Sequence, residues 1–329
     1  MACKRSGVQF PSAPPFSSLK IDHFASVNSM VAVVMRTYER PVMLARAIAS
    51  VQNQTFRDWT LIIVNNGGNP GPVDDVVRVA KSATPCGDIR VLHLSERVGM
   101  EEASNRGLAA TQSEFFAIHD DDDSWAARFL EVAVEEMHAH PSAAAVVTGI
   151  NRIHELYRDG KVLPVRAEKF FLNEERLTYM GMIGNNTFPP IAALFQRRLL
   201  HEVGNFDSSL PVLGDWEFNL RAVLAGGFVF VPERLANYHT RTPDSETASG
   251  NSITVGIDLH HEVRGRLQKR WLEEPNIDGV NKGELSIASY VDERPVKSGG
   301  LLPKIAAGIR NPNRAARAIA RRLWRIISR

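Results

Sequence analysis

Four consecutive aspartates, Asp120 to Asp123, follow the apolar run FFAIH at residues 115–119. Two carboxylates about 5 Å apart repel each other by roughly 3 kcal/mol at an effective dielectric constant near 20. The cluster is therefore either a fully solvated loop that caps the following helix or a site that a cation completes. Asp120 and Asp122 supply hard oxygen ligands, which Mg²⁺ and Mn²⁺ prefer, and these ions keep open positions for substrate phosphates.

Two other chemistries also use closely spaced aspartates. A phosphohydrolase of the D-x-D-x-T/S type uses the two aspartates as nucleophile and acid, and Asp120, Asp122 and Ser124 have that spacing. A calcium-binding EF-hand loop fits badly, because its sixth position needs glycine and Trp125 stands there. The phosphohydrolase stays open as a second enzyme hypothesis.

Strand and helix patterns alternate from Met30 onward. Short apolar, β-branched runs predict strands at 31–35, 60–64, 90–94 and 114–119, and helical spacing of apolar residues predicts helices at 41–54, 73–82 and 101–111. This alternation implies right-handed crossovers and a parallel, doubly wound sheet. Ligands of such sheets bind beyond the carboxyl ends of the strands. Three polar segments fall there, at 36–40, 65–69 and 120–125.

The order of elements changes after the aspartate cluster. We expect a helix at 124–139, strands at 143–150, 191–195 and 228–232, a hairpin at 151–165 and helices at 196–204 and 215–227. The second half is therefore predicted to be mixed α/β structure that continues the first half.

The composition is that of an ordinary globular protein, with 44% hydrophobic and 23% charged residues among 329. Two cysteines are too few for a disulfide framework, which fits a reducing compartment. No apolar run approaches the roughly 18 residues of a membrane span, and the start lacks the apolar core of a signal peptide. We therefore expect a cytoplasmic protein. The composition of residues 1–29 predicts that they are disordered, and Met30 is an alternative translation start.

The segment NRAARAIARRLWRIISR at 313–329 has the pattern of a basic amphipathic helix. Such a helix can lie on an anionic membrane surface, so we expect a peripheral protein at the inner face of the cell membrane. The alternative is a helix that docks on the rest of the chain through its apolar side. No nucleic-acid recognition fold accompanies the basic residues, so nucleic acid is not an expected partner.

Three blocks of sequence resemble glycosyltransferase family 2. They read VAVVMRTYERPVMLARAIASVQNQTFRDWTLIIVNNGG at 31–68, ERVGMEEASNRGLAATQSEFFAIHDDDDSW at 96–125 and GNFDSSLPVLGDWEFNLRAVLAG at 204–226. The resemblance implies the GT-A fold, a Rossmann-like α/β domain over 30–245 with a mostly parallel, doubly wound sheet. Its nucleotide-binding half is expected at 30–125 and its acceptor-binding half at 126–245. Residues 246–329 are then a C-terminal helical and basic tail.

The resemblance also implies a D-x-D motif at the aspartate cluster. Asp120 is expected to contact the ribose of the nucleotide, Asp121 to belong to the donor site, and Asp122 to bind the Mg²⁺ or Mn²⁺ that bridges the donor's diphosphate. Displacement of a nucleoside diphosphate builds negative charge on the leaving oxygen, and a bound cation stabilises that charge. His239 is a further candidate metal ligand.

Asp215 stands where the family has its catalytic aspartate. It is expected to take the proton of the acceptor hydroxyl as that oxygen attacks the anomeric carbon opposite the diphosphate, so that one displacement inverts the configuration. The alternative is an aspartate that only caps the helix after it. Trp216 is a candidate sugar platform for the acceptor, with a place in the core as its alternative.

The first two blocks are expected to hold the nucleotide sugar. The residues assigned to it there are Thr37, Tyr38, Glu39, Arg40, Asn66 and Arg106, and an exposed helix position is an equal alternative for Arg106. Three residues depart from the family pattern: Arg36 replaces proline, Asn66 replaces aspartate and Gly214 replaces glutamate. The Asn66 side-chain oxygen can still accept a hydrogen bond from a pyrimidine, without the charge.

The sequence therefore predicts an inverting, metal-dependent glycosyltransferase. The expected donor is a nucleoside-diphosphate sugar, preferably a UDP-sugar. The expected acceptor is a glycan or lipid-linked glycan in cell-surface polysaccharide synthesis. A non-catalytic nucleotide-sugar-binding protein is the alternative from another class, because Asn66 and Gly214 depart from the pattern within the site. The sequence does not specify the donor sugar, the acceptor or the oligomeric state.

Overall fold

The computed structural model describes residues 29–83, 87–158, 161–241, 257–274 and 281–292. The expected disorder at the start of the chain and the basic helix at 313–329 fall outside these ranges, apart from Ser29. Within them, one nine-stranded sheet is covered by helices, so the predicted α/β class is confirmed.

The first half of the sheet is parallel, as predicted. Its strands are β1 (Val31–Thr37), β2 (Trp59–Asn65), β3 (Asp88–His93) and β4 (Phe115–Asp120), and its helices are α1 (Pro41–Gln52), α2 (Pro70–Ala83) and α3 (Met100–Ala109). The strands lie in the order β3-β2-β1-β4 and all three pairs are parallel. Parallel neighbours need crossover helices on the faces of the sheet, which is why β1, β2 and β4 are apolar and buried along nearly their whole length.

The register of these strands gathers the three polar segments at one edge. Arg36 of β1 lies opposite Asp120 of β4, and Thr37 lies opposite Asn65 of β2. The carboxyl ends of the three strands therefore meet, as ligand sites of open α/β sheets require.

The second half is mixed, also as predicted. Its elements are β5 (Ser124–Trp125), α4 (Phe129–Ala139), β6 (Ala145–Arg158), β7 (Lys161–Lys169), η1 (Glu174–Leu177), α5 (Tyr179–Met182), η2 (Pro190–Ala192), β8 (Ala193–Gln196), α6 (Leu199–Glu202), α7 (Gly214–Gly226) and β9 (Phe228–Arg241). The sheet continues as β4-β8-β6-β9-β5, with β8 antiparallel to both of its neighbours. The predicted hairpin is confirmed by the antiparallel pairing of β6 with β7.

The segment after the aspartates differs from the prediction. The helix expected from residue 124 begins only at Phe129, because Ser124 and Trp125 form β5, antiparallel to β9. The N-cap of α4 is Arg128, so the aspartate cluster does not cap this helix. The pairing partner, β9, lies more than a hundred residues away, so no local sequence pattern predicts β5.

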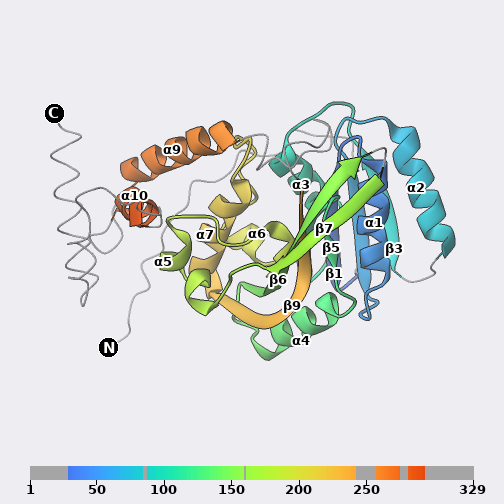
Figure 1. The fold of residues 1–329 in the computed structure, drawn as a ribbon. Helices are drawn as coiled ribbons and strands as arrows, with labels where there is room; N and C mark the ends of the chain where they lie inside the picture. The colour runs from blue at the N-terminus through green and yellow to red at the C-terminus, as the bar shows by residue number, and fades with distance from the viewer. Residues whose placement is uncertain (1–28, 84–86, 159–160, 242–256, 275–280, 293–329) are drawn as a thin grey trace.

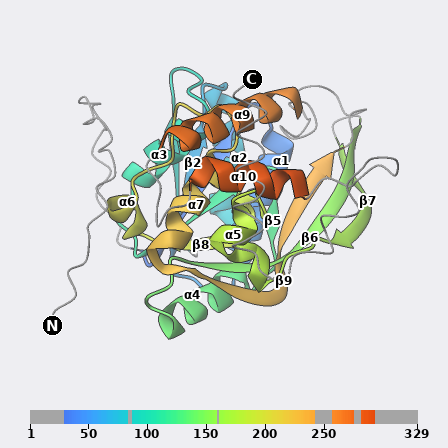
Figure 2. The same ribbon diagram turned by 90° about the vertical axis from the view of Figure 1, so that its left-hand side faces the viewer.

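Two C-terminal helices, α9 (Ile257–Glu273) and α10 (Lys282–Asp292), pack on the sheet domain. Figures 1 and 2 show them beside α5 and α7, at the end of the molecule opposite α1 and α2. Trp271 of α9 is fully buried, with its ring centroid 5.1 Å from that of Trp216. The sequence grouped residues 257–292 with the tail, but their packing makes them part of the folded domain.

Candidate active site

The aspartate cluster is buried rather than solvated. Asp121, Asp122 and Asp123 expose 0%, 6% and 1% of their surface, and only Asp120 is appreciably accessible, with 28% of its side chain exposed. Buried carboxylates are costly unless they are paired. The solvated-loop interpretation is therefore wrong, and the charge of the cluster has to be compensated within the site.

Arginines from residues 36–46 and from the end of β9 supply that compensation. Arg36 pairs with Asp120, and Arg40 places Nη2 2.6 Å from Asp121 Oδ1 and Nη1 3.3 Å from Asp122 Oδ2. Arg241, at the end of β9, is fully buried and pairs with Asp122. Arg46 of α1 donates to the backbone carbonyl of Asp122. These guanidinium groups therefore offset the mutual repulsion of the four carboxylates.

These contacts give the buried aspartates different pKa values. Burial alone would raise the pKa of Asp122, but Arg40 and Arg241 hold it below its ordinary value. Burial raises the pKa of Asp121 to about 6 against the pull of Arg40, and burial together with Asp122 raises that of Asp123 well above its usual range. At neutral pH, Asp122 is therefore the most firmly ionised of these three buried carboxyls.

His239 has a different environment from the one predicted. Its Nδ1 lies 2.6 Å from Glu155 Oε1, its Nε2 lies 2.9 Å from Ser124 Oγ, and its backbone N–H donates to Asp123 Oδ1 at 2.8 Å. Both ring nitrogens are thus engaged by the protein, which does not support the predicted role as a metal ligand. The ring instead links β9 to β6 and β5, and the backbone N–H links β9 to the aspartate cluster.

The donor chemistry of the aspartates still suits a hard cation. Among the described residues no group of three or more His, Cys, Asp or Glu side chains could hold a metal by itself. Mg²⁺ and Mn²⁺ bind through one or two carboxylates when a substrate's phosphates and water complete the shell. Asp120 is accessible and Asp122 is ionised, so the pair fits an ion of that kind.

Asp215 lies in the first turn of α7, whose N-cap is Leu213. The N-cap alternative for Asp215 is therefore wrong. Its carboxylate accepts a hydrogen bond from Asn186 Nδ2 at 2.7 Å and lines a small hollow of about 10 Å³. Burial raises the pKa of this carboxyl, opposed by Asn186 and by the backbone N–H of Trp216. A carboxylate with a raised pKa at the wall of a hollow is suited to accept a proton.

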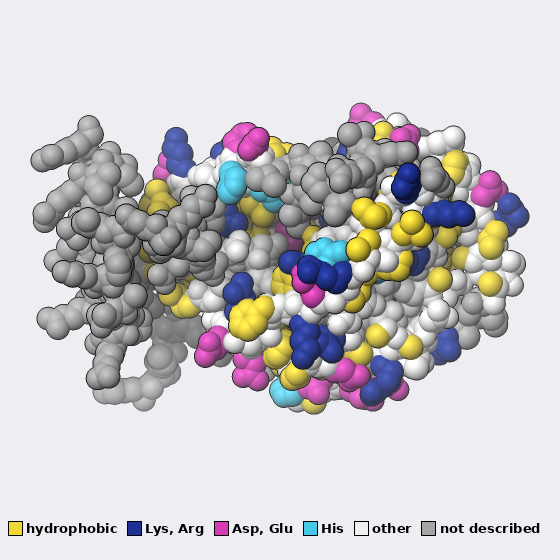
Figure 3. All heavy atoms as spheres, in the orientation of Figure 1, with side chains coloured by type: hydrophobic (Ala, Val, Ile, Leu, Met, Phe, Trp, Pro, Cys, Tyr) yellow, Lys and Arg dark blue, Asp and Glu magenta, His cyan; other side chains and the backbone are white. Residues whose placement is uncertain are grey.

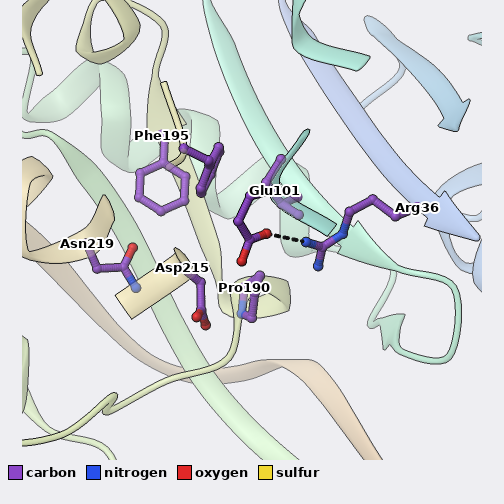
Figure 4. A pocket seen from close by; sticks show the side chains of 8 residues that line it. Arg36, Glu101, Pro190, Phe195, Asp215 and Asn219 are labelled. Atoms are coloured by element: carbon purple, nitrogen blue, oxygen red, sulfur yellow. Dashed lines mark hydrogen bonds and ion pairs between the residues drawn. The ribbon is translucent and has the colours of Figure 1, made fainter. Parts of the chain in front are cut away.

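Figure 4 shows the hollow beside Asp215. Its lining residues are Arg36, Glu101, Ile118, Pro190, Phe195, Phe206, Asp215 and Asn219. Arg36 belongs to the strand edge that carries the aspartates, so the candidate base and the candidate donor site share a wall.

Trp216 belongs to the core. It is fully buried against Trp271, and its indole N–H donates to the carbonyl of Met182 at 2.7 Å. The predicted sugar platform is therefore contradicted, because no face of the ring can reach an acceptor.

The predicted nucleotide residues lie at the edge formed by β1 and β2, with one exception. Thr37 Oγ1 donates to Asp121 Oδ2 at 2.7 Å, and the guanidinium of Arg97 lies 4.4 Å from the ring centroid of Tyr38. Glu39 takes a left-handed backbone (φ 53°) in the loop before α1. Arg106 is the exception, since its Nε pairs with Glu102 Oε1 one turn away along α3 at 2.9 Å.

Asn66 is engaged within the protein. It is 6% exposed, its Oδ1 accepts from the N–H of Val98 at 2.9 Å, and its Nδ2 donates to the carbonyl of Gly99. The side chain fixes the loop before α3, which argues against the predicted hydrogen bond between Asn66 and the nucleotide base.

Residues 32–204 match the family described as Glycosyl transferase family 2. The chain belongs to this family. The membership removes the phosphohydrolase hypothesis, and the observed sheet agrees with the predicted GT-A fold.

Curated relatives of this family 2 chain include two from Bacillus subtilis (strain 168). The uncharacterized glycosyltransferase YwdF is 28% identical over 58% of this chain and 67% of its own length. The putative teichuronic acid biosynthesis glycosyltransferase TuaG is 27% identical over 51% of this chain and 62% of its own length. The chain thus spans about two thirds of the length of these relatives.

Two solved structures share the fold. S. aureus TarS 1-349 in complex with UDP-GlcNAc has a TM-score of 0.60 at 16% identity, covering 79% of this chain and 71% of that one. The mannosyltransferase PcManGT from Pyrobaculum calidifontis, in complex with GDP-Man and Mn²⁺, has a TM-score of 0.56 at 16% identity, covering 90% and 81%.

Sequence reasoning missed several residues of this family 2 site. Glu101, Arg46 and Glu155 lie within it, and Arg97 lies against Tyr38. Each reaches its partner from a distant segment, so no spacing in the sequence marks it. One residue in the sequence did point to Glu101. Gly214 replaces the glutamate of the family pattern, so a carboxyl from another segment could occupy that space.

Proposed function

We propose that this chain is an inverting glycosyltransferase that moves a sugar from a UDP-sugar to a glycan or lipid-linked glycan in cell-surface polysaccharide synthesis. The similarity to TuaG, a putative teichuronic acid biosynthesis glycosyltransferase, supports the polysaccharide pathway, and the UDP-GlcNAc complex of TarS supports the class of donor. The GDP-Man complex of PcManGT supports the broader class, a nucleoside-diphosphate sugar.

One observation carries the proposal. Asp215, a carboxylate with a raised pKa, faces a hollow whose wall also contains Arg36, and Arg36 pairs with Asp120 at the carboxyl end of β4. A proton acceptor and a strand edge suited to a diphosphate therefore adjoin one space. A single displacement needs both groups around one anomeric carbon.

The transfer proceeds in one step. The acceptor oxygen forms a bond to the anomeric carbon while the bond from that carbon to the diphosphate oxygen breaks, and Asp215 takes the proton of the acceptor hydroxyl. The leaving nucleoside diphosphate keeps the electron pair, and the configuration inverts. Arg36 and Arg40 place positive charge at the edge where that negative charge develops.

We propose that Asp122, with Asp120, holds Mg²⁺ or Mn²⁺ when the donor is bound. The ion would supply a Lewis acid beside the diphosphate. Support comes from the hard oxygen ligands of the cluster and from the Mn²⁺ in the PcManGT complex.

We place the enzyme in the cytoplasm, peripheral at the inner face of the membrane. No helix among the described residues is long and apolar enough to cross a bilayer. The contact with an anionic surface is assigned to residues 313–329, which lie outside the described ranges.

The test compares donor binding with transfer. Wild-type protein should be thermally stabilised by UDP or a UDP-sugar with Mn²⁺ and should transfer the sugar to a glycan acceptor. Asp215→Asn should keep that stabilisation and lose transfer by ~10²-fold or more, because the proton acceptor is gone. Asp75→Asn, at an exposed ion pair on α2, is the control and should behave as wild type.

Two outcomes would contradict the proposal. Donor binding without transfer by the wild type, across a panel of acceptors, would support the non-catalytic alternative. Full transfer activity in Asp215→Asn would show that Asp215 is not the catalytic base.

A further inference from the structure

Gly214 leaves a space that another residue fills. A side chain at this position would collide with Cγ, Cδ and Oε1 of Glu101, which reaches it from α3. Those Glu101 atoms are the nearest neighbours of the missing Cβ. A carboxyl from α3 thus occupies the space that a residue directly before Asp215 would otherwise use.

Two contacts and its burial fix Glu101 in that space. Its Oε1 accepts the backbone N–H of Gly214 at 3.1 Å, its Oε2 lies 3.3 Å from Arg36 Nη1, and the residue is 3% exposed. The N-cap residue Leu213 has a left-handed backbone and makes no side-chain cap. Glu101 therefore satisfies the first N–H of α7 from another helix, a task that capping side chains usually perform.

We propose that Glu101 is a positioning residue for Asp215: its carboxyl anchors the first turn of α7 and stands beside the base in place of a side chain at 214. This inference rests on the proposed function of Asp215. Figure 4 shows both carboxyl groups at the same hollow, with Glu101 joined to Arg36.

The charge of Glu101 argues against a space-filling role. A buried carboxyl is costly, and an apolar residue of similar size would fill the space without that cost. The charged groups that face it are Arg36 of β1, Asp120 of β4 and Asp215 of α7. Burial raises the pKa of Glu101 to about 7, against the attraction of Arg36. Such a site retains a carboxyl only where its hydrogen bonds are needed.

The experiment moves the carboxyl from one element to the other. Glu101→Ala should lower kcat by ~100-fold, because a displacement of about 1 Å at a catalytic group can cost that much, while the Kd for UDP with Mn²⁺ changes less than about threefold. The double variant Glu101→Ala with Gly214→Glu should recover at least tenfold of the lost kcat, since the new side chain enters the vacated space. Glu101→Ala with Gly214→Met restores the side-chain volume without a carboxyl and should not recover.

Glu101→Gln is the control for misfolding, because its side chain has nearly the same volume and keeps an acceptor for the Gly214 N–H. It should retain more kcat than Glu101→Ala and change the pH profile of kcat near pH 7. Wild-type kcat in Glu101→Ala, or equal recovery by the two double variants, would overturn the proposal. Failure of the proposed function is separate, because it appears as wild-type transfer activity in Asp215→Asn whatever residue stands at 101.

Discussion

At the scale of single residues, the site is organised by guanidinium–carboxylate pairs. Arg241 and Asp122 are both buried, and Arg40 shares the same carboxylate. Removing one partner of a buried pair leaves the other charge uncompensated, and that cost exceeds the value of an exposed pair. The stability of the domain should therefore depend on these arginines even when no substrate is bound.

Arg241→Met should lower the free energy of unfolding by about 3 kcal/mol, because it leaves Asp122 buried beside fewer positive charges. Urea denaturation of the apo protein measures the change. Arg78→Met, at an exposed pair on α2, is the matched control and should cost less than about 1 kcal/mol. Adding Asp122→Asn to Arg241→Met should restore part of the loss; equal losses for Arg241→Met and Arg78→Met would refute this account.

Glu101 should make stability depend on pH. Its pKa is about 7 in the folded protein against 4.5 ordinarily, so the folded state holds the proton more tightly. Stability is therefore lost as the pH rises from about 4.5 to about 7, by up to roughly 3 kcal/mol. Unfolding free energies at pH 5 and pH 8 should fall less for Glu101→Gln than for the wild type. Parallel falls for both proteins would be inconsistent with a buried, titrating Glu101.

At the scale of elements, the sequence predicted what local patterns encode. The apolar runs of β1, β2 and β4 and the helical spacing of α1 placed these elements within a few residues, because each is stabilised by burial along its own length. β5 was missed because its two residues are a strand only through β9. The carboxyl ends of the strands could likewise be predicted as the site.

The partners within the site could not be predicted in the same way. Glu101 and Gly214 are 113 residues apart, and Arg241 and Asp122 are 119 residues apart. These pairings are set by how the helices and strands pack, which leaves no period or motif in the sequence. Trp216 illustrates the same limit, since it is buried partly against Trp271 of α9, which lies far along the chain.

The packing of α9 predicts that it contributes to the stability of the domain. Trp271→Ala should lower the free energy of unfolding by about 3–5 kcal/mol, because a fully buried indole against Trp216 is lost. Leu272→Ala, at a 40% exposed neighbour on the same helix, is the control and should cost far less. If both variants unfold like the wild type in urea, α9 is not part of the cooperative domain.

At the scale of the whole molecule, one face combines apolar and basic side chains. Figure 3 shows them together over the β6–β7 hairpin, where Leu163 and Val165 are 48% and 63% exposed. This surface and residues 313–329 are two separate candidates for contact with a lipid-linked acceptor.

Removal of residues 313–329 should lower sedimentation with vesicles of phosphatidylglycerol by ~10-fold, because the basic amphipathic segment is expected to supply most of the attraction. Neutral phosphatidylcholine vesicles are the control and should bind neither protein. Unchanged sedimentation of the shortened chain, abolished instead by Leu163→Asp with Val165→Asp, would assign the contact to the hairpin and contradict the tail prediction.

The central claim is that Asp215 accepts the acceptor's proton in a single displacement. The most direct test is the anomeric configuration of the transferred sugar, read from the proton coupling of the product by NMR with an α-linked UDP-sugar donor. The account predicts a β-linked product from the wild type and loss of that product in Asp215→Asn. An α-linked product would contradict a single displacement and, with it, the assigned role of Asp215.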